Sequence, residues 1–349
     1  MLSRSTSGRI PYIDALRGVA LVLMVLNHAA GHLLDRSLDP GRYYLVYLTV
    51  SLSAPLFLFL VGFSLSLSFH NNQQQGRLHF YRQCLRRGTG LLAAGYMMNF
   101  VIAPGEPFYS GGILQTIGIA ILLVGPVVPW LQGRAYYHGA LILALMLYLA
   151  FVSAYPALSV WIARHPVFAH MFFEGFPPWP WISMVLAGLG YGCKWLEAGN
   201  RLHGERQKLS GTAITGMICL VIYFGWTATH GETFNFSIAN DYIINRHWLP
   251  GSLTVFWIIG MIFSAFAAMP RFFAGSHRYL QWLVPLGQAA FVLYIIHLII
   301  IAGLMERILG VRFHQWWQFA GFNLLLITAL VYFSSRYKPV MRHIRETMF

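Results

Sequence analysis

The polar residues of the apolar stretch at positions 11–31 are the first candidates for chemistry. Asp14 and Arg17 lie three residues apart, so in a helix they share a face and can form an ion pair. His28 follows Arg17 by eleven residues, which corresponds to about three helical turns and roughly 16 Å along the axis. One helix face is therefore expected to present a guanidinium at one end and an imidazole at the other. A neutral imidazole accepts protons near physiological pH, and a guanidinium binds phosphates.

The same residues also have a structural interpretation. An Asp14–Arg17 pair at a helix end can simply anchor the helix, and His28 can be a packed histidine that bonds to a neighbouring helix. The position of His28 beside Asn27, on the face of Arg17, favours a functional role over packing alone.

A second histidine occurs in a later apolar stretch, where Tyr294 and His297 are three residues apart and share a helix face. Polar side chains inside a membrane are costly and usually face the interior of a helix bundle or a wet cavity. Two imidazoles in one bundle therefore favour a shared polar cavity. Further candidates to line this cavity are Asn27, Gln115, Trp181, Tyr294 and Asn323.

A cluster of arginines occupies the segment 77–87. Arg82 and Arg86 are four residues apart and share a helix face, with Arg87 and Arg77 close by. Guanidinium groups bind phosphates in a bidentate manner, so the cluster is a candidate anion site. The excess of positive charge on cytoplasmic segments of membrane proteins explains the same residues without a ligand, and composition alone favours this explanation.

Other families of sites are not indicated. The sequence contains no G-x-x-x-x-G-K-[ST] or H-E-x-x-H pattern, so neither ATP hydrolysis nor a bound metal is predicted. The cysteines have no metal-like spacing and imply no disulfide framework; they are Cys84, Cys193 and Cys219.

The elements that carry these residues are predicted to be membrane helices. Of the 349 residues, 57% are hydrophobic and 10% are charged, whereas roughly 25% of a soluble domain is charged. The net charge of +13 alone would suggest nucleic acid as a partner. The charges, however, lie in short segments between apolar stretches, where they orient a membrane protein and touch anionic lipid. We therefore expect a bilayer and no nucleic acid as the partner.

Ten stretches are long and apolar enough to be predicted as spanning helices. These are residues 11–31, 43–69, 88–103, 111–130, 136–155, 179–195, 209–228, 249–268, 283–304 and 316–335. The first lacks a cleavage site behind it and is expected to be retained. The predicted fold is thus all-α, a polytopic membrane helix bundle that forms a single domain over residues 1–349.

The distribution of Lys and Arg predicts that both termini are cytoplasmic. With that orientation, most of the 24 basic residues face the cytoplasm, and Arg17 lies within the first span. The far side receives Arg36, Arg42, Arg164, Arg246, Arg307 and Arg312. The longest far-side loops, 156–178 and 229–248, contain aromatic, histidine and acidic residues. They are either binding loops or plain hydrophilic connections.

Several segments together resemble a family of membrane enzymes. The Ile13–His28 run resembles the opening helix of membrane acyltransferases, in which an arginine, ten residues and a histidine recur. Other segments resemble bacterial relatives of heparan-alpha-glucosaminide N-acetyltransferase. They are Pro55–Ser68, Tyr81–Arg87, Gly112–Gly118, Phe176–Ile182 and Leu286–His297.

This resemblance implies transfer of an acyl group, expected to be acetyl, from cytoplasmic acetyl-CoA to a glycan or other hydroxyl or amine acceptor on the far side. It implies that His28 is the catalytic imidazole, with His297 as a second catalytic candidate. Transfer through an acyl-histidine and direct transfer both stay open. The resemblance further implies that the coenzyme A phosphates are held by Arg17, Arg82 and Arg86, and Arg87 beside them is a further candidate for this binding. The location it implies is a multi-pass protein of a bacterial inner membrane.

The chain departs from the family at one position. The catalytic histidine of the family lies in the loop after the first span, where this chain has His32 but no clear equivalent. The assignment of the reactive residue to His28 therefore follows the broader arginine–ten–histidine pattern. The alternative functions are a transporter or flippase for a glycan or lipid-linked substrate, and a non-catalytic membrane scaffold. Both a monomer and a homodimer stay open.

Overall fold

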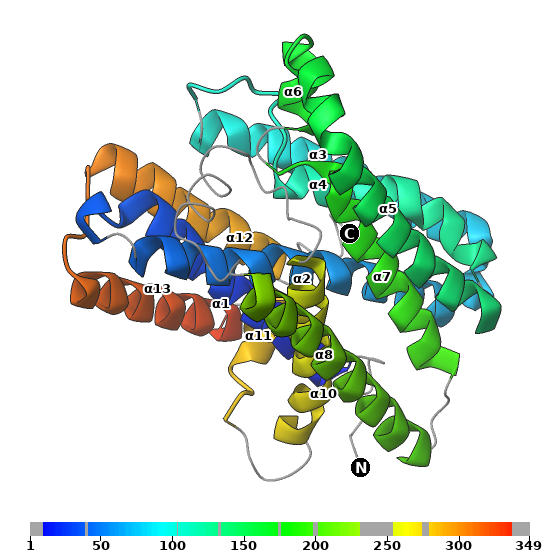
Figure 1. Cartoon of the computed structure of the whole chain (residues 1–349). Helices are drawn as coiled ribbons and strands as arrows, with labels where there is room; N and C mark the ends of the chain where they lie inside the picture. Colours follow the sequence, from blue (N-terminus) through cyan, green and yellow to red (C-terminus); the bar gives the residue numbers. More distant parts are fainter. Residues whose placement is uncertain are drawn as a thin grey trace. The chain divides into compact units, whose positions relative to one another are not determined.

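The computed structural model of the chain describes residues 10–38, 41–102, 104–131, 134–173, 176–197, 202–230, 254–273 and 279–336 (Figure 1). These residues are overwhelmingly helical, as expected for an all-α fold. The long helices are α1 (Pro11–Leu33), α2 (Gly41–Asn71), α3 (Gly76–Ile102), α5 (Arg134–Ile162), α7 (Pro178–Glu197), α8 (Leu202–His230), α10 (Thr254–Phe273) and α13 (Trp316–Arg336). The shorter ones are η1 (Arg36–Leu38), η2 (Gln73–Gln75), α4 (Ile113–Val124), η3 (Gly125–Trp130), α6 (Pro166–Phe172), α11 (Leu283–Gln288), α12 (Ala290–Leu298) and η5 (Ile299–Ile308).

The chain is a polytopic helical membrane protein. Within the described residues, seven helices are long and apolar enough to cross a bilayer. They are Pro11–Leu33, Leu52–Asn71, Ile113–Trp130, Gly211–Thr229, Val255–Phe273, Ala290–Ile308 and Trp316–Arg336. Helical segments also occupy the other predicted spans, 88–103, 136–155 and 179–195. The count of ten and the cytoplasmic location of the termini stay predictions, and both ends of the chain lie outside the described residues.

Three boundaries differ from the sequence prediction. The arginine cluster lies on α3, because this helix begins at Gly76 and not near residue 88. The first predicted far-side loop, 156–178, contains the end of α5 and the whole of α6. The predicted span 283–304 is divided into α11, α12 and η5. The second predicted loop, 229–248, lies almost entirely outside the described residues.

The chain divides into two compact units, with one boundary inside α2 between Leu56 and Phe57. The first unit holds α1, the beginning of α2, most of α8 and α10, and α11 to α13. The second unit holds the rest of α2 and α3 to α7. The expectation of a single domain stays a prediction.

Glycines bring α1 and α11 together in the first unit. A Cβ atom on Gly18 would lie 2.2 Å from the carbonyl oxygen of Leu283, and one on Gly287 would lie 1.7 Å from the carbonyl oxygen of Asp14. Larger side chains could not fit at either position, since both neighbours are backbone atoms. Around this crossing, α1 also contacts α12, η5 and α13, so it is the central helix of the group (Figure 1).

A seam of small residues joins α2 and α7 in the second unit. A Cβ atom on Gly62 would lie 1.9 Å from the carbonyl oxygen of Val185, and one on Gly188 would lie 1.9 Å from that of Phe59. Gly192 lies against the side chain of Ser66. Gly62 and Ser66 lie four residues apart and form a small-xxx-small packing surface, which permits close approach of the two backbones.

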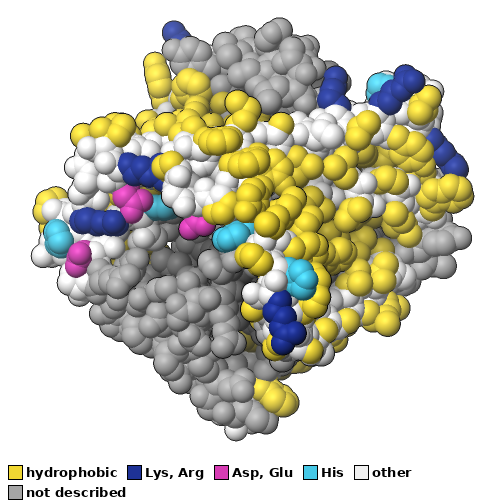
Figure 2. Space-filling model, turned by 90° about the horizontal axis from the view of Figure 1, so that it is seen from above, with side chains coloured by type: hydrophobic (Ala, Val, Ile, Leu, Met, Phe, Trp, Pro, Cys, Tyr) yellow, Lys and Arg dark blue, Asp and Glu magenta, His cyan; other side chains and the backbone are white. Residues whose placement is uncertain are grey.

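The protein exposes many large apolar side chains, as a lipid-facing surface requires. Examples on α8 are Met217 and Val221, which are 64% and 65% exposed. On the face drawn in Figure 2, hydrophobic side chains cover broad continuous areas and charged side chains occur in small groups. A soluble monomer rarely exposes apolar patches of this extent.

We expect Gly188→Ala to destabilise the α2–α7 packing, because the new methyl group would overlap the backbone of Phe59. Overpacking of this kind costs about 1–3 kcal/mol, and the melting temperature in detergent should fall. Gly225→Ala on α8 is the matched control, since no atom lies within 4 Å of the added methyl group. Equal melting temperatures of the two variants would contradict the proposed tight seam.

Candidate functional site

Asp14 lies near the start of α1 and is 5% exposed. Its carboxylate pairs with Arg17 on the same helix face, as the three-residue spacing predicts. The other carboxylate oxygen accepts a hydrogen bond of 3.2 Å from Nε2 of Gln288 on α11. The acidic side chain is therefore satisfied both within its own helix and across the glycine crossing.

Farther along α1, His28 meets His297 of α12. Nδ1 of His28 lies 2.9 Å from Nε2 of His297, and the two rings are stacked with centroids 5.1 Å apart. His28 is half-buried, whereas His297 is 0% exposed. The two histidines predicted from separate spans thus form one hydrogen-bonded pair between α1 and α12.

The hydrogen bonds determine which nitrogen of each neutral ring carries the proton. Nδ1 of His297 lies 2.9 Å from the carbonyl oxygen of Leu293, which can only accept, so this nitrogen is the N–H donor. Nε2 of a neutral His297 is then the acceptor, and Nδ1–H of His28 must donate to it. The lone pair of a neutral His28 is consequently on Nε2, the nitrogen that does not face His297.

Tyr294 completes an aromatic group around this pair. Its ring centroid lies 5.4 Å from that of His297 and 6.3 Å from that of His28. The shared face expected for Tyr294 and His297 is therefore present. Asn27 is half-buried on α1 beside His28.

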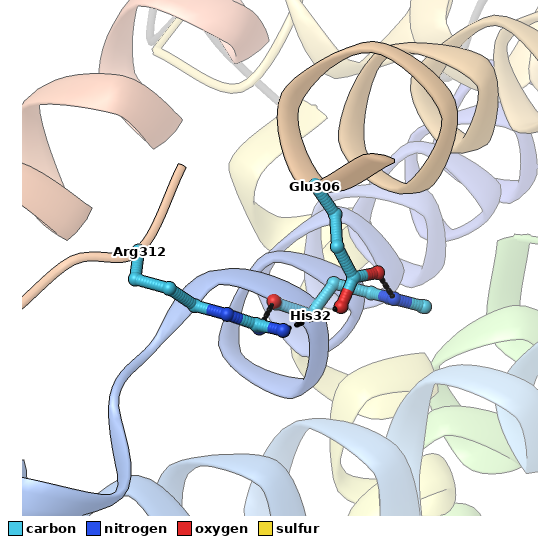
Figure 3. A network of polar contacts seen from close by, with 3 residues as sticks. All are labelled: His32, Glu306 and Arg312. Carbon is cyan, nitrogen blue, oxygen red and sulfur yellow. Dashed lines mark hydrogen bonds and ion pairs between the residues drawn. The ribbon is translucent and has the colours of Figure 1, made fainter. Parts of the chain in front are cut away.

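A second polar group joins α1 to η5, one turn beyond His28. Nδ1 of His32 lies 2.6 Å from Oε2 of Glu306 on η5, and Nη2 of Arg312 donates to Oε1 of Glu306 over 2.9 Å. Nη1 of Arg312 also donates to the backbone carbonyl of His32. Figure 3 shows the three side chains converging in this network.

The end of α1 is tied to the segment that carries Arg312. Phe313 donates its N–H to the carbonyl of Leu33 over 2.7 Å, and Asp35 donates its N–H to the carbonyl of Phe313 over 3.0 Å. His32 accordingly lies in the last turn of α1 and not in a loop after it. Asp35 accepts hydrogen bonds from Ser37, which lower the pKa of its carboxyl group below the ordinary value. This carboxylate also lies 3.8 Å from His314.

Most of the remaining predicted site residues belong to the second unit. Arg82 and Arg86 are exposed on α3, and Arg87 is half-buried there. Gln115 is 3% exposed, packs on Gly95 and Gly112, and donates to the carbonyl of Ser110. Trp181 is 2% exposed and stacks on Phe176. The expectation that Gln115 and Trp181 line a cavity with the histidines stays a prediction. Asn323 belongs to the first unit, where its amide donates to the carbonyl of Phe319 on the same helix.

Sequence reasoning missed Glu306 and Arg312. Acidic residues are scarce in this chain, with 11 in all, and Glu306 lies just after the predicted span that contains His297. That position could have indicated Glu306 as a site residue. An acidic residue at the end of a membrane span is a functional candidate for the same reason as a histidine within the span, because ionisable side chains are costly there.

Comparison with known families gives a match to a membrane-enzyme family. A model described as "Heparan-alpha-glucosaminide N-acetyltransferase, catalytic" matches residues 9–227, which is more than half of the chain. Comparison with curated proteins finds no match. The matched region includes α1 with Arg17, His28 and His32, and α3 with its arginines. It ends before α12 and η5.

The hydrogen-bond pattern predicts that His28 and His297 are both Nδ1–H tautomers when neutral. Nitrogen NMR of isotopically labelled histidine should show protonated Nδ1 and unprotonated Nε2 for both rings. His297→Phe supplies the assignment and removes the acceptor for His28, so the tautomer of His28 should no longer be fixed. A protonated Nε2 on neutral His297 would contradict the arrangement.

Proposed function

Because the chain belongs to the family of heparan-alpha-glucosaminide N-acetyltransferase catalytic domains, we propose that it transfers an acetyl group from acetyl-CoA to an amine or hydroxyl of a glycan. The donor binds from the cytoplasm and the acceptor from the far side of the membrane. The protein would then act as a multi-pass enzyme of a bacterial inner membrane. The transporter or flippase alternative is not favoured by the family match.

The observation that supports this function best is the orientation of His28 by His297. Attack on a thioester requires the acceptor nitrogen or oxygen to lose a proton as the new bond to the acetyl carbon forms. A positioned imidazole with a lone pair accepts that proton efficiently near neutral pH. The bond from Nδ1 of His28 to His297 leaves the lone pair on Nε2. His28 is therefore proposed as the general base.

His297 is proposed to orient His28 in the manner of the third member of a catalytic triad. Such a partner holds the imidazole in one tautomer and one orientation. His297 is suited to this role because its Nδ1 is bonded to the carbonyl of Leu293 and the whole side chain is buried. Tyr294 and Asn27 are proposed to line the space beside the pair.

The arginines are proposed to bind the phosphates of coenzyme A. Arg82 and Arg86 are suited to it because they are exposed one turn apart on the same helix, with Arg87 next to them. Arg17 is proposed to bind a phosphate as well, since a guanidinium has five N–H donors and can bond to Asp14 and a phosphate together.

Purified protein with radiolabelled acetyl-CoA and a panel of amino-sugar and hydroxyl glycans tests the activity. We expect His28→Ala to lose about 10²–10⁴-fold in turnover, the usual contribution of a general base, and to keep its affinity for coenzyme A. His297→Ala should lose less, because it removes orientation and leaves the base in place.

Single-turnover transfer by monodisperse His28→Ala protein is the decisive measurement. Turnover close to the parent value would remove His28 from the mechanism. A loss of coenzyme A affinity and folded yield together with turnover would instead indicate a structural histidine.

The double variant Arg82→Ala/Arg86→Ala should weaken coenzyme A binding by at least about tenfold, because each charge-assisted hydrogen bond contributes about 1.5–3 kcal/mol. Arg77→Ala on the same helix is the matched control, since the guanidinium of Arg77 lies over the ring of Trp130 at 5.3 Å. Calorimetry with equal affinities in the double variant and the control would leave the two arginines with a topological role alone.

A further inference from the structure

If His28 acts as a general base, the proton that it accepts must be removed after each turnover, and His297 cannot readily take it. Each turnover leaves a proton on Nε2 of His28, and it must leave before the next acceptor binds. His297 is poorly suited to receive it. That ring is 0% exposed, and both of its nitrogens already bond to Leu293 and His28. A cation there would be buried beside a carbonyl group without a carboxylate, which is costly.

His32 offers a more favourable position for the proton. It lies one turn from His28 on the same face of α1, and the centroids of the two rings are 6.3 Å apart. Its side chain is 33% exposed and faces the carboxylate of Glu306, which is 26% exposed. A protonated His32 would thus be paired with a carboxylate and in contact with water.

We propose that His32 and Glu306 form a proton relay that carries the proton from His28 to water. This inference rests on the proposed acetyl transfer. The nitrogen or oxygen of the acceptor forms its bond to the acetyl carbon as its N–H or O–H bond breaks and the proton passes to Nε2 of His28. The C–S bond of the thioester breaks, and coenzyme A leaves as a thiolate that takes a proton from water. The proton on His28 then passes to Nε2 of His32, directly or through one water molecule, and from His32 to solvent. Both histidines return to the neutral state, and no other reactant is needed.

Glu306 and Arg312 position His32 in this relay. Nδ1 of His32 donates to Oε2 of Glu306, which leaves Nε2 as the nitrogen that accepts and releases the proton. Arg312 bonds to the other oxygen of Glu306 and to the backbone of His32 (Figure 3). The side chain of Arg312 is 46% exposed and lies between the candidate spans Ala290–Ile308 and Trp316–Arg336, so this end of the network is at the edge of the membrane helices, where solvent can reach it.

The test is turnover of acetyl-CoA and amino-sugar or hydroxyl glycan in a weak, dilute buffer. His32→Ala should reduce turnover by roughly tenfold, less than loss of the base itself. Imidazole added at constant pH and ionic strength should restore it in a concentration-dependent, saturable manner, because a small diffusing base can replace a partly exposed relay group. His32→Asn should behave alike, since its amide nitrogen takes the position of Nδ1, can donate to Glu306 and cannot carry a proton.

His314→Ala is the matched control. His314 is an exposed histidine at the same end of α1, but it faces Asp35 and not Glu306. Turnover of the His314→Ala variant should equal that of the parent protein at every imidazole concentration. Chemical rescue separates a relay from a structural role, since imidazole in solution cannot restore lost packing.

Two results would overturn the relay and leave the proposed function intact. One is parent-like turnover of both His32 variants in dilute buffer, and the other is a loss that imidazole does not restore in either variant. Absence of acetyl transfer by the parent protein under all conditions would instead overturn the proposed function, and the relay with it.

Discussion

Polar groups within a bilayer have no water to bond, so each must find its partner in the protein. In the first unit, α1 meets this requirement at successive heights along one face. Asp14 bonds to Gln288 of α11, His28 to His297 of α12, and His32 to Glu306 of η5. Each interhelical bond of this kind contributes only about 0.6–2 kcal/mol. Their main effect is therefore to fix register and rotation, since turning or sliding α1 would break all three at once.

The glycine crossing makes this register possible. Gly18 and Gly287 let the backbones of α1 and α11 approach so closely that a methyl group at either position would overlap a carbonyl group. The short side chain of Asp14 can then reach Gln288 across the interface. The glycines allow the two helices to approach closely, and the polar side chains fix how the helices are aligned. The α2–α7 seam of the second unit shows the same close approach through small residues, with Gly62 facing the backbone of α7 and Gly188 facing that of α2.

Local helix geometry accounts for what the sequence could predict. The Asp14–Arg17 pair and the proximity of Tyr294 to His297 follow from three-residue spacing, and both are present. The close packing at Gly62 follows in the same way from its four-residue spacing to Ser66. The roles of these residues do not follow, because a histidine that bonds to another helix satisfies packing and catalysis equally well. The arginines of α3 are ambiguous for a similar reason, since membrane orientation and phosphate binding select the same side chain.

Partners that are distant in the sequence could not be predicted. His32 and Glu306 are separated by 274 positions, and no spacing rule connects them. Ordinary α-helical geometry would even have argued against His297 and Glu306 both facing α1. His297 and Glu306 are nine residues apart, which in an α-helix is about two and a half turns and places them on opposite faces. The segment Ile299–Ile308 is instead a π-helix, in which bonds to the fifth residue reduce the rotation per residue. This local unwinding turns Glu306 toward α1.

The π-helix thereby links local backbone geometry to the proposed chemistry. Such segments are rare and are found frequently at functional sites. With α-helical winding, the helix that supplies His297 could not also direct Glu306 at His32. Under the proposed mechanism, the two histidines of α1 need different partners: a buried neutral ring to fix the tautomer of the base, and a carboxylate near water to stabilise the departing proton. Residues four apart on a helix differ by about 6 Å in height, which is enough to place one partner at full burial and the other at the solvent boundary. The change from α- to π-winding after Leu298 allows a single neighbouring segment to provide both.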